Sequence, residues 1–306
     1  MMLKQIQGVV GTPVTPFTRK DEFDEPTYRT MIDFFIERSA SDAIASPMHI
    51  GESLNLTEAE RMRLAEVAVD QVNDRVPVII HASCPGTDQT IKLAKHAEDV
   101  GADAVISIVP YHWHPNQEGI YAHFQKLSRS IDIGMLAYNF PERIGVSLES
   151  ETLYRMVRDF DNFVGLKEAS YDMRYFSEVM RLVSSLKRNF SVFTGVEYPL
   201  PGMALGGHGC FSVVGAVAPN LMKNLYSACK KQEYSKARVM QYKMSEMLAI
   251  LLRFKLSSSV KAALEIMKRP VGKPRLPNVP LTRKETSILL AALKDSKILD
   301  TEPRGW

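Results

Sequence analysis

The strongest constraint on the fold is an alternation through most of the chain, in which short apolar segments are each followed by a helical pattern. Eight apolar segments predict strands, at residues 8–14, 43–46, 76–81, 104–109, 133–138, 163–167, 190–194 and 210–214. They lack the polar alternation of a sheet with one face in water. Such strands are typical of a parallel sheet that is buried on both faces.

The intervening segments predict helices, at residues 25–38, 87–100, 118–129, 148–158, 171–186, 199–205 and 219–230. A further helix starts after Thr57, which has Glu60 three residues later, the spacing of a capping box. Eight such units favour the α/β class and a closed (β/α)8 TIM barrel. An open doubly wound sheet is the alternative, but no G-x-G-x-x-G motif follows the first strand.

The chain continues beyond the eighth unit. Three more helices are predicted at residues 234–254, 259–268 and 283–294, with a proline-rich linker at 270–280. We therefore expect a (β/α)8 barrel over residues 1–232 and a C-terminal helical extension over residues 233–306.

Charge and cysteine usage narrow the classes of function. The formal net charge is +3, with both signs interspersed, which argues against a nucleic-acid partner. The three cysteines, Cys84, Cys210 and Cys229, predict neither a disulfide framework nor a zinc site, and they favour a reducing cytoplasm. Residues 1–7 lack a long apolar region and no run approaches 18 apolar residues, so neither a signal peptide nor a membrane span is predicted.

In a TIM barrel the functional residues lie at the carboxyl ends of the strands. Five histidines fall in or near these loops, but no carboxylate accompanies them at a ligand-like spacing, so no metal site is predicted: His49, His81, His112, His114 and His208. The glycine-rich segment 206–209 precedes the eighth strand. A tight turn explains this segment better than a phosphate cradle does.

Lys167 is the candidate around which the chemistry is arranged. It ends the apolar segment 163–167, where an unpaired ammonium is costly to bury. Such a lysine is either an ion-pair partner or a nucleophile whose pKa burial has lowered. Tyr138 ends the neighbouring strand, where it could donate and accept protons, and Arg143 follows with a planar fork for a carboxylate. Gly195, after the seventh strand, is a further candidate for substrate binding.

With these residues in place, the chain resembles the dihydrodipicolinate synthase / N-acetylneuraminate lyase family of class I aldolases. Motifs in the family's order carry the resemblance: Gly11-Thr12-Pro13-Val14-Thr15-Pro16-Phe17, Gly51-Glu52-Ser53 with Leu56-Thr57-Glu58-Ala59-Glu60-Arg61, Pro110-Tyr111 with Gln117-Glu118-Gly119, Tyr138-Asn139-Phe140-Pro141-Glu142-Arg143-Ile144-Gly145, Val164-Gly165-Leu166-Lys167-Glu168-Ala169-Ser170, Ala204-Leu205-Gly206-Gly207-His208-Gly209 and Val260-Lys261-Ala262-Ala263-Leu264.

The resemblance implies a Schiff base between Lys167 and a 2-oxo acid such as pyruvate, with Tyr138 as proton shuttle. It also implies that Arg143 and the backbone amides of Ile50 and Gly51 hold the carboxylate. A homo-oligomer, tetramer or dimer, is expected, and no metal or diffusible cofactor is required. A protonated imine fits this chemistry because it is an electron sink for a carbanion or enamine.

Two departures from the family pattern concern the substrate. His49 stands where the family has a hydroxyl that relays protons to the tyrosine. His112 stands where the synthases have a second tyrosine, which reaches the neighbouring subunit's site, and Trp113 follows it. We expect His49 either to handle protons, since imidazole titrates near neutrality, or only to shape the pocket. His112 is a candidate for substrate binding, and Trp113 for stacking or for an interface.

The sequence therefore predicts a lyase that acts on a 2-oxo acid through Lys167. A 4-hydroxy-tetrahydrodipicolinate synthase, which joins pyruvate to aspartate semialdehyde, is the alternative within the same chemistry. A non-catalytic binder of 2-oxo acids or sugar acids is the alternative from another class.

Overall fold

The computed structural model describes residues 4–306, and its centre is a closed barrel of eight strands in sequence order. All neighbouring strands are parallel, and β8 closes on β1 with Gly8 opposite Gly209 and Gly11 opposite Ser212. The strands are β1 Gly8–Gly11, β2 Ala43–Ser46, β3 Val78–His81, β4 Ala104–Ile108, β5 Gly134–Asn139, β6 Phe163–Glu168, β7 Ser191–Thr194 and β8 Gly209–Ser212. The predicted TIM barrel is thus confirmed.

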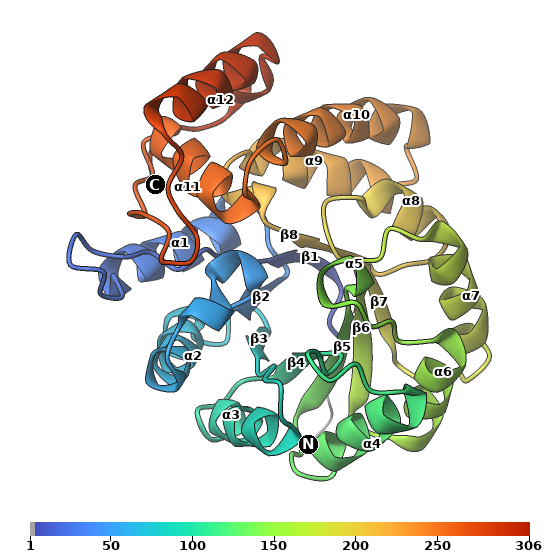
Figure 1. Ribbon diagram of the computed structural model, residues 1–306. Helices are drawn as coiled ribbons and strands as arrows, with labels where there is room; N and C mark the ends of the chain where they lie inside the picture. The colour runs from blue at the N-terminus through green and yellow to red at the C-terminus, as the bar shows by residue number, and fades with distance from the viewer. Residues whose placement is uncertain (1–3) are drawn as a thin grey trace.

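Helices surround the barrel as an outer ring, seen end-on in Figure 1. They are α1 Glu25–Glu37, α2 Glu58–Val72, α3 Thr87–Asp99, α4 Gln117–Ser128, α6 Ser150–Asp159, α7 Met173–Ser184, α8 Pro199–Ala204 and α9 Pro219–Lys230. Short helical turns lie in the connecting loops: η1 His49–Gly51, η2 Ser53–Asn55, α5 Pro141–Ile144 and η3 Val214–Ala216. The predicted capping box of Thr57 and Glu60 is present at the start of α2.

Three helices follow the barrel, α10 Tyr234–Leu251, α11 Leu256–Ile266 and α12 Arg283–Asp295, before the final turn η4 Ile298–Thr301. They gather on one side of the ring, with α12 outermost (Figure 1). Helix α10 packs against α8 and α9, and α11 contacts η1 in the loop after β2. The extension thereby reaches the face of the barrel where the strands end.

Several boundaries differ from those expected. The first strand ends at Gly11, not at residue 14, because Pro13 cannot donate to a ladder. Helix α11 begins at Leu256, three residues earlier than expected. Its serines obscure the apolar pattern, although Ser258 and Ser259 donate to the carbonyls of Val279 and Leu256.

The glycine-rich segment 206–209 forms a tight turn, as predicted. The amides of Gly206 and Gly207 donate to the carbonyls of Met203 and Gly202 at the end of α8. Gly209 has a φ of +144°, and a Cβ there would lie 1.9 Å from the carbonyl oxygen of Gly8. Glycine is therefore required for β8 to close on β1.

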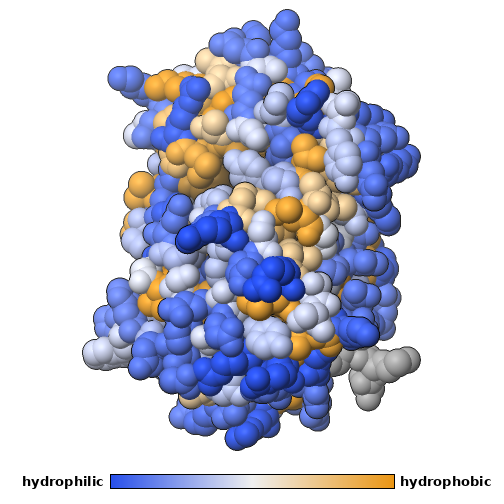
Figure 2. All heavy atoms as spheres, turned by 90° about the vertical axis from the view of Figure 1, so that its right-hand side faces the viewer, coloured by the Kyte–Doolittle hydropathy of each residue, from blue (hydrophilic) through white to orange (hydrophobic). Residues whose placement is uncertain are grey.

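The outer surface is mixed in polarity. Figure 2 shows hydrophilic and hydrophobic residues interspersed on the side of the molecule that carries α6 and α7. No helix among residues 4–306 is long and apolar enough to cross a membrane.

Candidate active site

Lys167 lies at the end of β6, directly beside Tyr138 in the register between β5 and β6. Its Nζ atom is 3.9 Å from the centroid of the Tyr138 ring and 4.9 Å from that of Phe211. The residue is 5% exposed, and burial lowers the pKa of its ammonium to about 7, although the charge of Glu197 opposes this shift. Lys167 has no ion-pair partner among the residues that the structure describes, so the ion-pair interpretation is wrong.

Tyr138 is also buried, and burial raises the pKa of its phenol well above the ordinary value. The phenol therefore keeps its proton at neutral pH, as a proton donor must. Its ring stacks on that of Phe140, with centroids 5.6 Å apart. The side chains of Lys167, Tyr138 and Phe140 thus pack in a row, which forms the floor of the candidate site.

His49 packs over this floor from η1. Its ring centroid is 5.4 Å from that of Tyr138, 6.1 Å from that of Phe140 and 5.8 Å from that of His81. Burial, with the positive charges of Lys167 and Arg143, lowers the pKa of His49 to about 4. The imidazole is therefore neutral at pH 7, which differs from the titration near neutrality expected from the sequence.

His81 lies behind His49 and is fully buried at the end of β3. Its Nε2 is 2.8 Å from the hydroxyl of Ser83, which itself accepts from the amide of Ile108. Burial lowers the pKa of His81 as well. Two neutral imidazoles, those of His49 and His81, therefore lie next to each other, and the His49 ring packs against Tyr138.

A cavity of about 750 Å³ opens above this floor. Its walls come from the loops after β2, β3, β4 and β5 and from the C-terminal extension: His49, Ile50, Glu52, Leu54, Asn55, Pro85, Tyr111, His112, Phe140, Arg143, Ile144, Lys255, Leu256, Ser257, Pro277 and Asn278. Lys167 and Tyr138 are not in the lining. The ring of Tyr138 packs against those of His49 and Phe140, which do line the cavity.

Candidate anion-binding groups lie beside His49. Ile50 lines the cavity, and Ile50 and Gly51 belong to η1, the turn that also carries His49. Arg143, on α5, is exposed at the rim, with its guanidinium 6.0 Å from the centroid of the Phe140 ring. These groups could bind a carboxylate next to Lys167.

Of the remaining predicted site residues, His112 lines the cavity, and Trp113 and Gly195 do not. His112 lines the cavity, and its backbone is left-handed, with a φ of +77°. Its ring centroid lies 4.9 Å from that of Trp113. The Trp113 side chain is 82% exposed and does not line the cavity. Gly195 is buried behind the site. Its amide donates to the carbonyl of Glu168 at 2.5 Å and continues the β6–β7 ladder, and substrate binding by Gly195 stays a prediction.

One functional feature was not recognised from the sequence, the clamp that fixes η1. Glu52 follows η1 with a left-handed backbone, φ +58°, and its buried carboxylate pairs with Lys261 of α11 at 2.8 Å. The same carboxylate accepts from the amide of Arg275 and the side chain of Asn278. The C-terminal extension therefore holds the loop that carries His49, Ile50 and Gly51.

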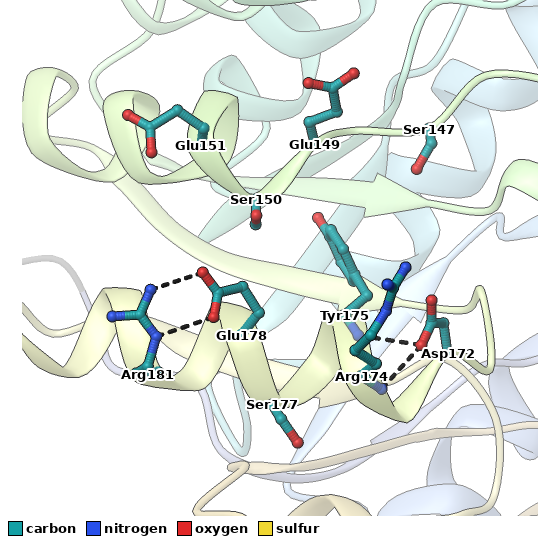
Figure 3. A pocket seen from close by; sticks show the side chains of 10 residues that line it. All are labelled: Ser147, Glu149, Ser150, Glu151, Asp172, Arg174, Tyr175, Ser177, Glu178 and Arg181. Carbon is teal, nitrogen blue, oxygen red and sulfur yellow. Dashed lines mark hydrogen bonds and ion pairs between the residues drawn. The ribbon is translucent and has the colours of Figure 1, made fainter.

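A second hollow, of about 850 Å³, lies outside the barrel between α6 and α7 (Figure 3). Arg181 and Glu178 pair along α7, and Asp172 caps that helix, as the dashed lines show. Four carboxylates line this hollow, those of Glu149, Glu151, Asp172 and Glu178, against the two guanidinium groups of Arg174 and Arg181. The excess of negative charge disfavours binding of an anionic substrate there. In residues 4–306, no group of three or more His, Cys, Asp or Glu side chains is arranged to hold a metal ion.

Comparison with known proteins agrees with this geometry. The model of the dihydrodipicolinate synthetase family matches residues 5–296. The chain belongs to this family. Its members are class I lyases that act through a Schiff base, and the protein is therefore an enzyme of this class, an aldolase-type lyase.

The similar proteins cover the family from several lineages. The 4-hydroxy-tetrahydrodipicolinate synthase of Methanopyrus kandleri is 35% identical over 98% of this chain and 99% of its own. That of Syntrophus aciditrophicus is 38% identical over 92% of this chain and 94% of its own. The crystal structure of the Thermotoga maritima dihydrodipicolinate synthase has a TM-score of 0.91 and 33% identity, over 97% of this chain and 100% of that one.

Proposed function

We propose that the protein binds pyruvate or another 2-oxo acid as a Schiff base on Lys167 and uses the imine for aldol cleavage, dehydration or condensation. The observation that carries this proposal is a buried lysine without an ion-pair partner, whose pKa burial lowers to about 7. About half of its amine is then unprotonated and nucleophilic at neutral pH.

The chemistry follows from the residues around the amine. The Nζ lone pair attacks the ketone carbon, and the resulting carbinolamine loses water to give the imine, with its oxygen protonated by a donor nearby. Tyr138 is that donor in the proposal, because its phenol stays protonated next to Nζ. Arg143 and the amides of Ile50 and Gly51 would hold the carboxylate, which orients the ketone toward Lys167.

His49 enters the proposal as a neutral imidazole. With a pKa of about 4 it is a weak base, but it can pass a hydrogen bond between Tyr138 and the substrate. His112, at the rim of the cavity, would contact the part of the substrate farthest from the imine. His49 and His112 replace residues of the synthase relay, which supports a substrate other than aspartate semialdehyde.

The relatives favour one alternative within the same chemistry, 4-hydroxy-tetrahydrodipicolinate synthase, since several bear that name. Family members are typically oligomeric, although a monomeric dihydrodipicolinate synthase variant also resembles this chain, with a TM-score of 0.91. We propose a homo-oligomer, tetramer or dimer, that works in the cytoplasm.

Borohydride trapping with pyruvate, followed by peptide mass spectrometry, tests the Schiff base. A reduced pyruvyl adduct is expected on Lys167 and is lost in Lys167→Met. If a panel of 2-oxo acids gives no adduct, the non-catalytic binder becomes the better account. Assays of the same protein with pyruvate and aspartate semialdehyde then separate the synthase from the other lyases.

A further inference from the structure

The start of α11 forms a wall of the cavity that the proposed Schiff-base chemistry does not use. Lys255, Leu256 and Ser257 line the cavity from this helix, and Asn278 lines it from the linker that follows. Arg143 belongs to a different wall, because it comes from α5 after β5. The cavity is also far larger than a pyruvate requires, with about 750 Å³ of space.

The ionisable groups of the lining leave two cations without a partner. Glu52 is neutralised by Lys261 at 2.8 Å, His49 is neutral because its pKa is about 4, and burial raises the pKa of the Tyr111 phenol. Arg143 and Lys255 form no ion pair with any residue in the range 4–306. Apart from the imidazole of His112, the remaining charge of the lining is therefore positive.

Ser257 adds a second, independent sign of a ligand. Three serines follow one another in the first turn of α11, and the hydroxyls of Ser258 and Ser259 each donate to a backbone carbonyl. Ser257 is only 6% exposed and lines the cavity, yet its hydroxyl has no hydrogen-bond partner. A buried hydroxyl without a partner is costly, so a ligand that satisfies it would bind favourably.

The backbone of the same turn points to an anion. Helix α11 has 11 residues and no side chain that caps its amino end, where Lys255 is the N-cap residue. The free amides of a first helical turn carry a partial positive charge and attract negative groups. Ammonium, hydroxyl and free amides thus converge on one wall of the cavity.

We infer that Lys255, Ser257 and the amino end of α11 bind a second anionic group, so that the substrate carries a distal carboxylate or phosphate besides its 2-oxo acid carboxylate. The inference rests on the proposed function, because it assigns the first carboxylate to Arg143 and the amides of Ile50 and Gly51. The reaction partner of pyruvate is then an aldehyde with an acidic group at its far end.

Condensation with pyruvate tests this selectivity. Succinic semialdehyde and glyceraldehyde 3-phosphate carry the two anionic groups, and butyraldehyde and glyceraldehyde are their neutral counterparts. At least one anionic aldehyde should have a KM about tenfold below that of its neutral counterpart, the effect of one charge-assisted hydrogen bond. Lys255→Gln should remove this preference by raising KM for the anionic aldehyde, with kcat little changed. Equal KM values for the charged and neutral aldehydes would overturn the inference.

Matched variants locate the site. Arg253→Gln removes the same charge from an exposed residue that does not line the cavity, so the preference should persist in it. Ser257→Ala should weaken the preference without changing the charge. Arg143→Gln should impair trapping of pyruvate itself, which a distal site would not do. If Arg253→Gln and Lys255→Gln have the same effect, only the general surface charge matters and the site is refuted.

A readout without turnover separates this inference from the proposed function. Glutarate, a dicarboxylate, should raise the melting temperature more than butyrate does, and Lys255→Gln should cancel the difference. Failure of pyruvate trapping on Lys167 refutes the Schiff-base function whatever glutarate does. Trapping without any preference for glutarate refutes only the distal anion site.

Discussion

Lys167 shows at the scale of a single residue how burial prepares a nucleophile. Its free amine should bind pyruvate faster as the pH rises through about 7, because burial lowers its pKa to that value. At pH 6 about a tenth of the amine is neutral, against about half at pH 7, so initial trapping rates should differ about fivefold. Pre-steady-state trapping between pH 5.5 and 9 measures this rise. A midpoint near 10, typical of an exposed lysine, would contradict the buried, desolvated amine.

His49 gives the second prediction for a single residue. Since its pKa is about 4, His49 stays neutral from pH 5 upward and acts by hydrogen bonding, not by titrating. We expect His49→Ala to slow the exchange of the methyl protons of pyruvate with solvent about a hundredfold, the lower range for a lost proton-transfer group. His49→Gln, which keeps a neutral donor and acceptor, should retain part of the rate.

Exchange followed by proton NMR in deuterated buffer, without an acceptor aldehyde, isolates the proton transfer. An unchanged rate in His49→Ala would leave His49 only a role in shaping the pocket. The trapping yield on Lys167 serves as the control for folding, because it requires an intact barrel mouth.

At the scale of elements, the clamp between α11 and η1 should decide whether the site keeps its shape. Lys261→Met leaves the buried carboxylate of Glu52 without its partner, and the loss of a buried pair costs about 3–5 kcal/mol of unfolding free energy. Denaturant unfolding should show this loss, and Lys243→Met, on the exposed side of α10, should change stability by less than about 0.5 kcal/mol.

The double variant Glu52→Gln with Lys261→Met distinguishes charge from packing. It should recover most of the lost stability, because no unpaired charge remains in the interior. If it is as unstable as Lys261→Met alone, Lys261 matters through its packing and its hydrogen bond to the carbonyl of Lys273, and not through its charge.

The elements also show what the sequence could and could not predict. Periodicity and the capping box of Thr57 were enough for the barrel and for α2, because both signals are local. The same local signals missed α5, which is only four residues long. They also missed the clamp, since Glu52 and Lys261 are distant in sequence and meet only once α11 packs over η1.

The site was predictable to a similar extent. Strand order brings Tyr138 beside Lys167, so their pairing follows from the barrel alone. The low pKa of His49 does not follow from sequence, because it depends on burial and on the summed charges of Lys167 and Arg143. The amide of Gly195 donates to the carbonyl of Glu168 and so continues the β6–β7 ladder by one residue, because Glu168 pairs with Thr194 in that ladder.

At the scale of the whole molecule, the exposed indole of Trp113 predicts a subunit contact beside the cavity. It is 82% exposed in the single chain, on the same loop as His112, and such an aromatic is typical of the buried core of an interface. We expect Trp113→Ser to lower the association constant by at least tenfold, the effect of about 1.4 kcal/mol, measured by sedimentation velocity over a range of concentrations.

A second exposed aromatic residue marks an alternative place for the subunit interface. Tyr242, on α10, is 67% exposed, and Tyr242→Ser should leave the assembly intact if the contact lies at the loop after β4. Dissociation by Tyr242→Ser, with an intact assembly in Trp113→Ser, would move the interface to the C-terminal helices. Because His112 lines the cavity beside Trp113, dissociation at the loop should also raise the KM of the acceptor aldehyde. Assembly and substrate binding would then depend on the same loop, residues 109–116 between β4 and α4.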